Sequence, residues 1–393
     1  MERILKISEN RAKQVTTKFY RYLYQYIDWN QPLIIIKGAR GTGKTTLLLQ
    51  KIKEEGEGIY LSLDDLYFEI NRLILLVEEL YEKGERTFYF DEIHQYQYWA
   101  KDLKNLYDNY PDIKMIATGS SAIRIENEQA DLSRRAVTYT LYGLSFREFL
   151  NLEFNQNFEK IKLQDLLKEH SEISTSINDL MRPLSVFEQY LEFGYYPFFI
   201  SDKKFYSQKI EQIVRLITKI DLPAVENISY STVRSMKGLF YVISQSVPFT
   251  PNIQKLANKM GIPRNSVLKA LDLLEKGGVI NLLRTDTKGI SYLQKPEKIY
   301  LENTNLAYVF SGGTPNKGNL RETFFFNQLK VANKITSSRF SDFFVDDHYT
   351  FEIGGAAKTN RQIKDIPQAY IAADEIENGQ QNKIPLWLFG FLY

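Results

Sequence analysis

The sequence predicts an α/β fold, with a parallel sheet in its first part, followed by a helical segment, a unit of three helices with a hairpin, and a last α/β unit. Over the first 145 residues, short apolar runs alternate with stretches of helical periodicity. A glycine-rich turn follows the apolar run from Pro32 to Lys37 and opens a helical stretch. From Arg147 to about Tyr230, strand signals are few. Short apolar strands that alternate with helices are typical of a parallel sheet covered on both faces.

The individual elements follow from the periodicity of apolar residues. In the first part we expect helices at residues 11–29, 44–55 and 66–83, and strands at 32–37, 58–63, 87–90, 114–118 and 136–141. Residues 147–230 form a helical stretch. Helices at 233–244, 252–260 and 263–276 are then followed by strands at 279–284 and 290–293. Three helices and a hairpin in this order predict a winged helix-turn-helix.

Two ends of these elements have specific signals. Thr250-Pro251-Asn252 is interpreted as a cap with proline at the first helical position. Residues after Gly312 form a last α/β unit, which we expect to end in an apolar strand from Ile384 to Tyr393.

Composition excludes several classes of protein. The chain has 393 residues and a formal net charge of +2, so any basic surface must be local. It contains no cysteine, which excludes disulfides, thiolate zinc sites and cysteine nucleophiles. The three histidines are isolated in the sequence and do not suggest a metal site. Neither a signal peptide nor an apolar run of the ~20 residues that span a bilayer is present, so we expect a cytoplasmic protein without membrane contacts.

The turn after the first strand matches the phosphate-loop pattern G-x-x-x-x-G-K-[ST] in full. Its glycines let the backbone curl, so that successive N–H groups point at phosphate oxygens beside the start of a helix. Lys44 is expected to reach the β- and γ-phosphates, and the Thr45 hydroxyl to bind Mg²⁺. The nucleotide-binding residues expected here are Gly38, Ala39, Arg40, Gly41, Thr42, Gly43, Lys44, Thr45 and Thr46.

Two carboxylates close the apolar strand that follows about fifty residues later. A carboxylate at the end of a strand beside a phosphate loop holds Mg²⁺, and we assign this role to Asp91. Glu92 is the next residue and is expected to polarise the attacking water as a general base. The sequence therefore predicts ATP and Mg²⁺ as ligands, with Lys44 and Glu92 as catalytic residues.

Two further features each leave two interpretations open. Thr118-Gly119-Ser120-Ser121 follows the fourth strand, where Ser120 would sense the γ-phosphate or the turn would simply cap the strand. Arg134 and Arg135 precede the fifth strand. Either of them would act as an arginine finger on the nucleotide of a neighbouring copy, which implies a homo-oligomer, and we assign this role to Arg135. The other interpretation is a solvated basic pair.

Together these motifs resemble the prokaryotic AAA-type ATPases that carry a C-terminal DUF4143 region. The resemblance covers nearly the whole chain and continues through Leu144-Ser145-Phe146-Arg147-Glu148-Phe149, Gly194-Tyr195-Tyr196-Pro197 and Phe351-Glu352-Ile353-Gly354-Gly355. It implies ATPase activity and an AAA+ core, with an extra strand between the phosphate-loop strand and the Asp91 strand. It also implies a C-terminal domain similar to restriction-endonuclease folds. We therefore expect an AAA+ core at 1–150, a helical lid or linker at 151–230, a winged helix at 231–311 and a nuclease-like α/β domain at 312–393.

The carboxylates that such a nuclease fold requires occur in order as Glu322, Asp342 and Glu352. The usual lysine would stand two residues after Glu352, where the chain has Gly354, and the next lysine is Lys358. Without that cation the scissile phosphate loses a positioning charge, so we expect an inactive domain.

The expected winged helix carries a local basic excess. Nine lysine and arginine residues stand against four acidic residues between Pro251 and Tyr300. Arg264, Asn265 and Lys269 would face duplex DNA from the third helix, and Lys288 would contact phosphate from the wing. Protein contacts or internal packing with solvated lysines remain the other interpretation.

The predicted function is Mg²⁺-dependent ATP hydrolysis coupled to a conformational change near DNA. A nucleotide-gated protein-interaction module with slow turnover is the alternative, and an ATP-regulated nuclease is a third.

Overall fold

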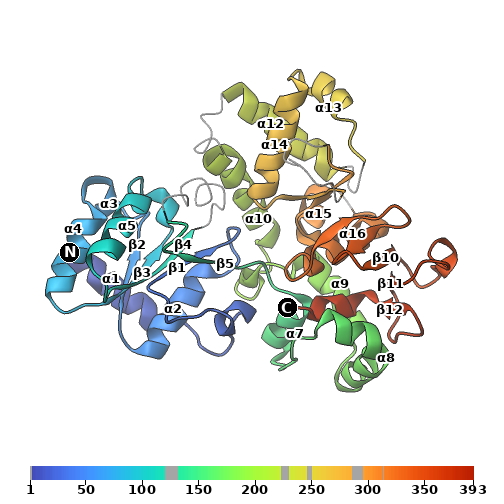
Figure 1. Ribbon diagram of the computed structural model, residues 1–393, viewed down its shortest axis with the longest axis horizontal. Helices are drawn as coiled ribbons and strands as arrows, with labels where there is room; N and C mark the ends of the chain where they lie inside the picture. Colours follow the sequence, from blue (N-terminus) through green and yellow to red (C-terminus); the bar gives the residue numbers. More distant parts are fainter. Residues whose placement is uncertain (1, 120–131, 223–229, 246–249, 286–294, 313) are drawn as a thin grey trace. The chain divides into compact units, whose positions relative to one another are not determined.

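A computed structural model describes residues 2–119, 132–222, 230–245, 250–285, 295–312 and 314–393. The chain divides into two compact units, residues 1–143 and 144–393 (Figure 1).

The first unit is built on a five-stranded sheet in the order β2-β3-β4-β1-β5. All four neighbouring pairs are parallel. The strands are β1 (Leu33–Lys37), β2 (Ile59–Ser62), β3 (Thr87–Asp91), β4 (Lys114–Gly119) and β5 (Val137–Thr140). Because β4 lies between β1 and β3, the extra strand implied by the family resemblance is present.

Helices cover both faces of this sheet (Figure 1). They are α1 (Glu2–Gln14), α2 (Lys44–Glu55), α3 (Tyr67–Ile70), α4 (Leu73–Glu82) and α5 (Trp99–Asn109), with short 3-10 turns η1 (Tyr22–Gln25) and η2 (Ile93–Gln95). Alternate residues of β1 enter different cores, because successive strand side chains point to opposite faces. Leu33 and Ile35 pack with α4 and α5, whereas Ile34 and Ile36 pack with α2.

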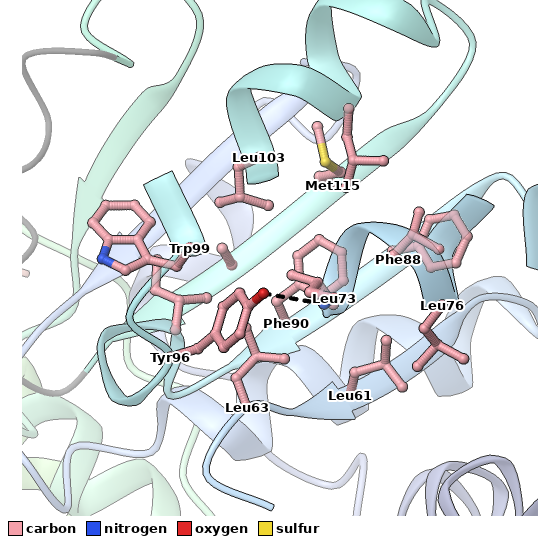
Figure 2. Packing of buried hydrophobic residues seen from close by; sticks show 14 of the residues in the cluster. Leu61, Leu63, Leu73, Leu76, Phe88, Phe90, Tyr96, Trp99, Leu103 and Met115 are labelled. Carbon is pink, nitrogen blue, oxygen red and sulfur yellow. Dashed lines mark hydrogen bonds between the residues drawn. The ribbon is translucent and has the colours of Figure 1, made fainter. Parts of the chain in front are cut away.

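The core under α4 and α5 shows how the Asp91 strand is held (Figure 2). Phe88 and Phe90 of β3 are fully buried between Leu73, Leu76 and Leu103. The backbone N–H of Leu73 donates to the Tyr96 hydroxyl at 3.2 Å. These contacts hold β3 from the face of the sheet that is opposite to α2. The carboxyl end of β3, where Asp91 lies, therefore has a defined position.

Two expected helices in this unit differ from the structure. Instead of one helix over 11–29, α1 ends at Gln14 and only the short η1 follows. The β-branched run Val15-Thr16-Thr17 disfavours a helix. In addition, the side-chain amide of Gln50 donates hydrogen bonds to the carbonyls of Thr16 and Phe19, each at 2.8 Å.

The expected helix over 66–83 is divided into α3 and α4. Asn71 and Arg72 between them have extended backbones. The Asn71 side chain donates to the Tyr67 carbonyl at 2.9 Å and so satisfies an acceptor at the end of α3.

The second unit begins with helices, as the sequence predicts. They are α7 (Phe146–Phe154), α8 (Leu163–Leu180), α9 (Pro183–Phe193), η4 (Pro197–Phe199), α10 (Tyr206–Leu216) and the π-helical turn η5 (Ile217–Asp221). Helix α7 starts with a capping box, in which the N–H of Glu148 donates to Ser145 and the Glu148 carboxylate accepts from the N–H of Ser145.

Three helices and a strand pair follow. They are α12 (Tyr230–Ser244), α13 (Ile253–Met260), α14 (Arg264–Lys276), and the antiparallel strands β6 (Ile280–Leu283) and β7 (Lys298–Leu301). The strand expected at 290–293 lies outside the described residues, and the described partner of β6 is β7. Asn252 caps α13 by accepting from the N–H of Lys255 at 2.9 Å. The interpretation of Pro251 as the first helical residue was therefore wrong, because this proline precedes the cap.

A second sheet lies in the last part of the chain, in the order β12-β11-β10-β9-β8. Its strands β10, β11 and β12 are parallel, and β8, β9 and β10 are antiparallel. The elements are α15 (Thr304–Phe310), α16 (Lys317–Leu329), β8 (Ile335–Ser337), β9 (Phe343–Val345), β10 (Tyr349–Gly354), η7 (Asn360–Gln362), β11 (Ala369–Ala373), β12 (Lys383–Pro385) and η8 (Leu386–Phe391).

The apolar strand expected from Ile384 to Tyr393 was mostly wrong. Only its start belongs to β12, and Leu386 to Phe391 form the 3-10 helix η8. All six residues of η8 are buried. A segment that is buried on all sides shows no periodicity that would separate a strand from a helix.

None of the described helices is long and apolar enough to cross a membrane.

Candidate nucleotide-binding site

The phosphate loop joins β1 to α2 and depends on glycine at three positions. Gly41 and Gly43 have φ values of 82° and 96°, which other residues rarely adopt. A Cβ atom on Gly38 would lie 2.2 Å from the carbonyl oxygen of Leu141, so only glycine fits there. These three residues let the backbone curl tightly in front of the first turn of α2.

Lys44 is 4% exposed and lies inside the curve of this loop. Its Nζ donates to the carbonyls of Gly38 at 2.8 Å and Ala39 at 2.9 Å. The Thr42 hydroxyl also donates to the Ala39 carbonyl, at 2.9 Å. The ammonium is thus held where the loop and the N-terminus of α2 meet. Among the other expected nucleotide contacts, Arg40 is half-buried and Thr46 is exposed.

Asp91 ends β3 and is 2% exposed. Its Oδ2 accepts from the Thr45 hydroxyl at 2.7 Å and from the Tyr60 hydroxyl at 2.8 Å. Its Oδ1 accepts from the Thr118 hydroxyl and from the N–H of Glu92. Thr45 and Asp91, both expected at the metal, are therefore in direct contact, and they offer the oxygen ligands that Mg²⁺ prefers.

Glu92 has a left-handed backbone, with φ 52° and ψ 41°. For a residue with a side chain this conformation is uncommon, and such strain clusters at functional sites. The Glu92 side chain is 20% exposed, and its Oε2 lies 3.5 Å from Nε2 of the buried His94. The chain therefore turns sharply after Asp91 and leaves the Glu92 carboxylate partly exposed at the carboxyl edge of the sheet, the edge that also carries the phosphate loop.

Tyr60 was missed by the sequence analysis. It lies on β2, which pairs with β3 so that Ser62 is the partner of Asp91. The Tyr60 hydroxyl accepts from Nη1 of Arg11 at 2.7 Å and donates to Asp91. Burial and the charge of Asp91 raise the pKa of Tyr60, so the phenol stays protonated and remains a donor. The rule that adjacent parallel strands end at the same edge of a sheet would have placed the end of β2 beside Asp91, but it does not single out Tyr60, which precedes that end.

The fourth strand contributes Thr118 to the site. Thr118 is fully buried and donates to Asp91. Ser120, the residue expected to sense the γ-phosphate, lies outside the described residues.

Arg135 is not near the other expected catalytic residues. It precedes β5 and so lies at the amino edge of the parallel sheet, opposite the edge that carries the phosphate loop. It forms a two-point ion pair with Asp108, with N–O distances of 2.7 and 2.9 Å. Arg134 beside it is exposed. Within one copy, Arg135 therefore does not reach the Lys44 site.

The carboxylates expected for a nuclease are held by lysines. Lys298 Nζ bridges Glu322 at 3.0 Å and Asp342 at 3.1 Å. Burial and then the charge of Asp342 raise the pKa of Glu322. Among the described residues, no group of three or more histidine, aspartate or glutamate side chains is placed to hold a metal ion.

The missing lysine after Glu352 has a replacement. A Cβ on Gly354 would lie 2.6 Å from Cγ of Lys358, so the stem of Lys358 fills the space of a side chain at position 354. The ammonium of Lys358 forms an ion pair with Glu352. The expectation that this position lacks a cation was therefore wrong, although the Glu322–Asp342 pair is closed by Lys298.

The residues expected to contact DNA lie on the surface of the second unit. Arg264, Asn265 and Lys269 are exposed on α14, and Lys288 lies outside the described residues. A cavity of about 440 Å³ at the N-termini of α13 and α14 is lined by Thr250, Pro251, Asn252, Ile253, Gln254, Arg264 and Lys295.

Residues 30–150 match the AAA domain family. The match supports a P-loop AAA-type ATPase domain in the first unit. Residues 184–317 match a domain of unknown function, DUF8612. The resemblance had led us to expect a DUF4143 region, and the family found for this segment is a different one.

Two curated relatives are uncharacterized proteins. One, from Methanocaldococcus jannaschii, is 30% identical over 264 residues, which are 62% of this chain and 55% of that protein. The other, from Haemophilus influenzae, is 23% identical over 308 residues, 72% of this chain and 71% of that protein. The chain thus spans about half the length of the first relative.

Two solved structures show some similarity to this chain. One is the Walker-type ATPase PABY2304 of Pyrococcus abyssi, with 15% identity and a TM-score of 0.43. This match covers 77% of the present chain and 95% of that protein. AMPPCP-bound DnaA from Aquifex aeolicus has 15% identity and a TM-score of 0.24, and covers 70% of this chain and 88% of its own.

Proposed function

We propose that the first unit binds ATP with Mg²⁺ and hydrolyses it. The observation that carries this proposal is the direct contact between the Thr45 hydroxyl and the Asp91 carboxylate, 2.7 Å apart, beside the buried ammonium of Lys44. These three groups are the ones that a phosphate-bound Mg²⁺ requires.

Each group has a distinct task in this proposal. The loop amides and Lys44 would hold the phosphates, with Lys44 exchanging its two carbonyl contacts for phosphate oxygens. Thr45 and Asp91 would hold Mg²⁺, which neutralises charge that develops on the phosphates. Glu92 would accept a proton from the attacking water, since its carboxylate is more exposed to solvent than that of Asp91.

ATP turnover and ATP binding separate these tasks. Lys44→Ala is expected to lose both, because the phosphates lose their cation. Glu92→Gln is expected to bind ATP as the wild type does and to lower turnover by about 10²–10⁴-fold. Calorimetry with MgATP and a phosphate-release assay measure the two quantities. Wild-type turnover in Glu92→Gln would contradict the assignment of the base, and absence of heat with folded wild-type protein would contradict the whole proposal.

We further propose that hydrolysis drives a conformational change that acts on duplex DNA through the second unit. Support comes from the basic excess around α14 and from the cavity that Arg264 and Lys295 line at two helix N-termini. Helix N-termini and guanidinium groups both favour phosphate oxygens. Asn265 and Lys269 would lie beside the same strand of DNA.

This second step has its own test. The ATPase rate with and without duplex DNA, and the affinity for duplex DNA, are measured from low to moderate salt for wild type and Arg264→Gln/Lys269→Gln. The double variant is expected to lose about two units of the salt slope of DNA affinity. Lys162→Gln/Lys168→Gln makes the same charge change at exposed positions before and within α8 and serves as the control. Equal DNA affinity in both double variants would exclude α14 as the DNA-binding element.

A nucleotide-gated interaction module with slow turnover is the second candidate. It is favoured by the ion pair that holds Arg135 on Asp108, because a finger so engaged is withdrawn from any neighbouring nucleotide. It predicts purified protein that retains nucleotide, with turnover that rises when Asp108→Asn releases Arg135. An Asp108→Asn variant with unchanged turnover at every protein concentration would argue against a regulatory role of this pair.

A further inference from the structure

Arg21 lies behind the phosphate loop and joins it to the end of the first unit. Its guanidinium is buried, and the residue is 5% exposed. Nη1 donates to the carbonyl of Thr42 in the loop. Nη2 donates to the carbonyls of Tyr142 and Gly143, both at 2.8 Å. Gly143 is the last residue of this unit, so one side chain binds both the loop and the point where the chain leaves.

A second contact joins the same two segments at the start of the loop. We call residues 140–143 the exit segment. The N–H of Leu141 donates to the carbonyl of Lys37 at 2.8 Å, and the Leu141 carbonyl lies so close to Gly38 that only a glycine fits. Tyr22, the neighbour of Arg21, donates from its hydroxyl to the carbonyl of Thr140 at 3.0 Å. The exit segment is therefore held against the loop at both of the loop's ends.

The bond from Arg21 also orients the loop for phosphate. In a trans peptide the C=O and the following N–H point in opposite directions. Because the Thr42 carbonyl points at Arg21, the N–H of Gly43 must point away from it. Gly43 is the N-cap of α2, where outward-pointing amides bind phosphate.

The guanidinium makes this linkage stiff. It is planar and charged at every physiological pH, so its donors are always present. A buried carbonyl that loses its donor is costly, and Thr42 is itself fully buried. Movement of the Thr42 carbonyl therefore either breaks a buried bond or moves Arg21 and the exit segment with it.

We infer that Arg21 is a positioning residue that aims the loop amides at phosphate and transmits nucleotide occupancy to the exit segment. This inference rests on the proposed ATP binding. It adds the physical route by which that binding reaches the chain that enters the second unit.

The experiment uses the full chain with a donor and an acceptor dye. Because the chain has no cysteine, Glu82→Cys and Glu172→Cys give two unique labels at exposed positions, one in each unit. Energy transfer is recorded as MgATP is titrated, and ATP affinity is measured separately by calorimetry. Arg21→Gln is compared with Arg86→Gln. Arg86 likewise donates to two backbone carbonyls, at 2.8 and 2.9 Å, but lies before β3 at the other edge of the sheet.

In the wild type we expect MgATP to change energy transfer. In Arg21→Gln we expect ATP affinity to fall by about tenfold, the loss typical of a bond to a charged donor. At saturating MgATP the change in energy transfer should be lost in this variant, and Arg86→Gln should retain both properties. Arg21→Lys keeps the positive charge but lacks the two separate N–H groups with which the guanidinium binds Thr42 and the exit segment. It should therefore recover ATP affinity, while the change in energy transfer stays lost.

Two results would overturn the inference while leaving ATP binding intact. One is a full change in energy transfer in saturated Arg21→Gln, and the other is a wild type that binds MgATP without any change. Should Arg21→Gln lack the wild-type circular dichroism spectrum, Arg21→Lys serves as the test variant by the same criterion. A wild type that gives no calorimetric heat with MgATP overturns the proposed function and this inference together.

Discussion

At the scale of single residues, the candidate site is held together by donors to one carboxylate. Asp91 accepts from three hydroxyls and one backbone N–H. Thr45 is needed for Mg²⁺ in the proposal, whereas Tyr60 and Thr118 hold the carboxylate in place. The role of Tyr60 can be separated from packing, because phenylalanine keeps the ring and removes only the donor.

Tyr60→Phe is expected to raise the KM for MgATP by about tenfold, since a hydrogen bond to a charged group contributes roughly 1.5–3 kcal/mol. Steady-state turnover as a function of the MgATP concentration measures this KM. Tyr139→Phe is the matched control, because the Tyr139 hydroxyl accepts from the N–H of Asp28 and does not touch Asp91. Similar KM changes in both variants would show that Tyr60 acts through stability alone.

Lys298→Met tests the ion pairs that Lys298 forms with Glu322 and Asp342 in the second unit. Removing the ammonium leaves Glu322 and Asp342 facing each other, which is expected to cost about 2 kcal/mol of unfolding free energy at pH 7.5. Glu322 already has a raised pKa, and losing Lys298 raises it further. A group with a raised folded pKa stabilises below its unfolded pKa and loses that contribution as pH rises through the folded value.

The loss in Lys298→Met should therefore be smaller at pH 5 than at pH 7.5, as measured by urea unfolding. Lys317→Met removes an exposed lysine that pairs with Glu375 and should leave stability almost unchanged at both pH values, because solvent screens this pair. A pH-independent loss in Lys298→Met would contradict the electrostatic explanation.

At the scale of elements, the sequence predicted what depends on local pattern and failed where tertiary contacts decide. The five strands of the first sheet were placed within a residue or two, because each is a short apolar run between turns. The phosphate loop and Asp91 could be placed together because carboxyl ends of parallel strands share an edge. Arg21 and Tyr60 reach the same place from other elements and belong to no local motif.

The errors have the same physical origin. The helix expected over 11–29 is lost because Gln50 takes carbonyls that the helix would need. The last apolar run is a 3-10 helix because it is buried on every side. The lysine missing from position 354 is replaced in space rather than in sequence, by a side chain four residues later. The assigned roles at the nucleotide site and the four-part division remain predictions.

The start of α7 provides a test at this scale. The Ser145 hydroxyl accepts from the N–H of Glu148 at 3.1 Å and donates to the carbonyl of Tyr393 at 2.8 Å. Ser145→Ala is expected to lower the unfolding free energy by about 1–2 kcal/mol, the range for a lost N-cap. Ser185→Ala removes an exposed hydroxyl that bonds only to the nearby Arg182 carbonyl and should cost a few tenths of that. Equal losses in urea unfolding would show that the cap does not stabilise α7.

At the scale of the whole molecule, the two compact units should unfold separately. Ligand that binds only the folded first unit raises its stability by about 2.7 kcal/mol at a hundredfold excess over Kd. Trp29 and Trp99 belong to this unit and Trp387 to the other. In Trp387→Phe the urea transition seen by tryptophan fluorescence should therefore shift with MgATP. In Trp29→Phe/Trp99→Phe the remaining transition should not shift, and a single ligand-sensitive transition in both would show one cooperative unit.

The contact between α1 and β2 has a practical consequence. Ser8 accepts from the N–H of Tyr60 at 2.8 Å, and Arg11 of the same helix binds the Tyr60 hydroxyl. The region that matches the AAA domain family begins at residue 30, after both α1 and Arg21. A fragment cut at that boundary would keep the whole phosphate-loop motif and lose the helix whose Ser8 and Arg11 hold Tyr60, a donor to Asp91. If such a fragment were inactive, the cause would be the loss of α1 and its contacts with Tyr60, and not the absence of a catalytic residue.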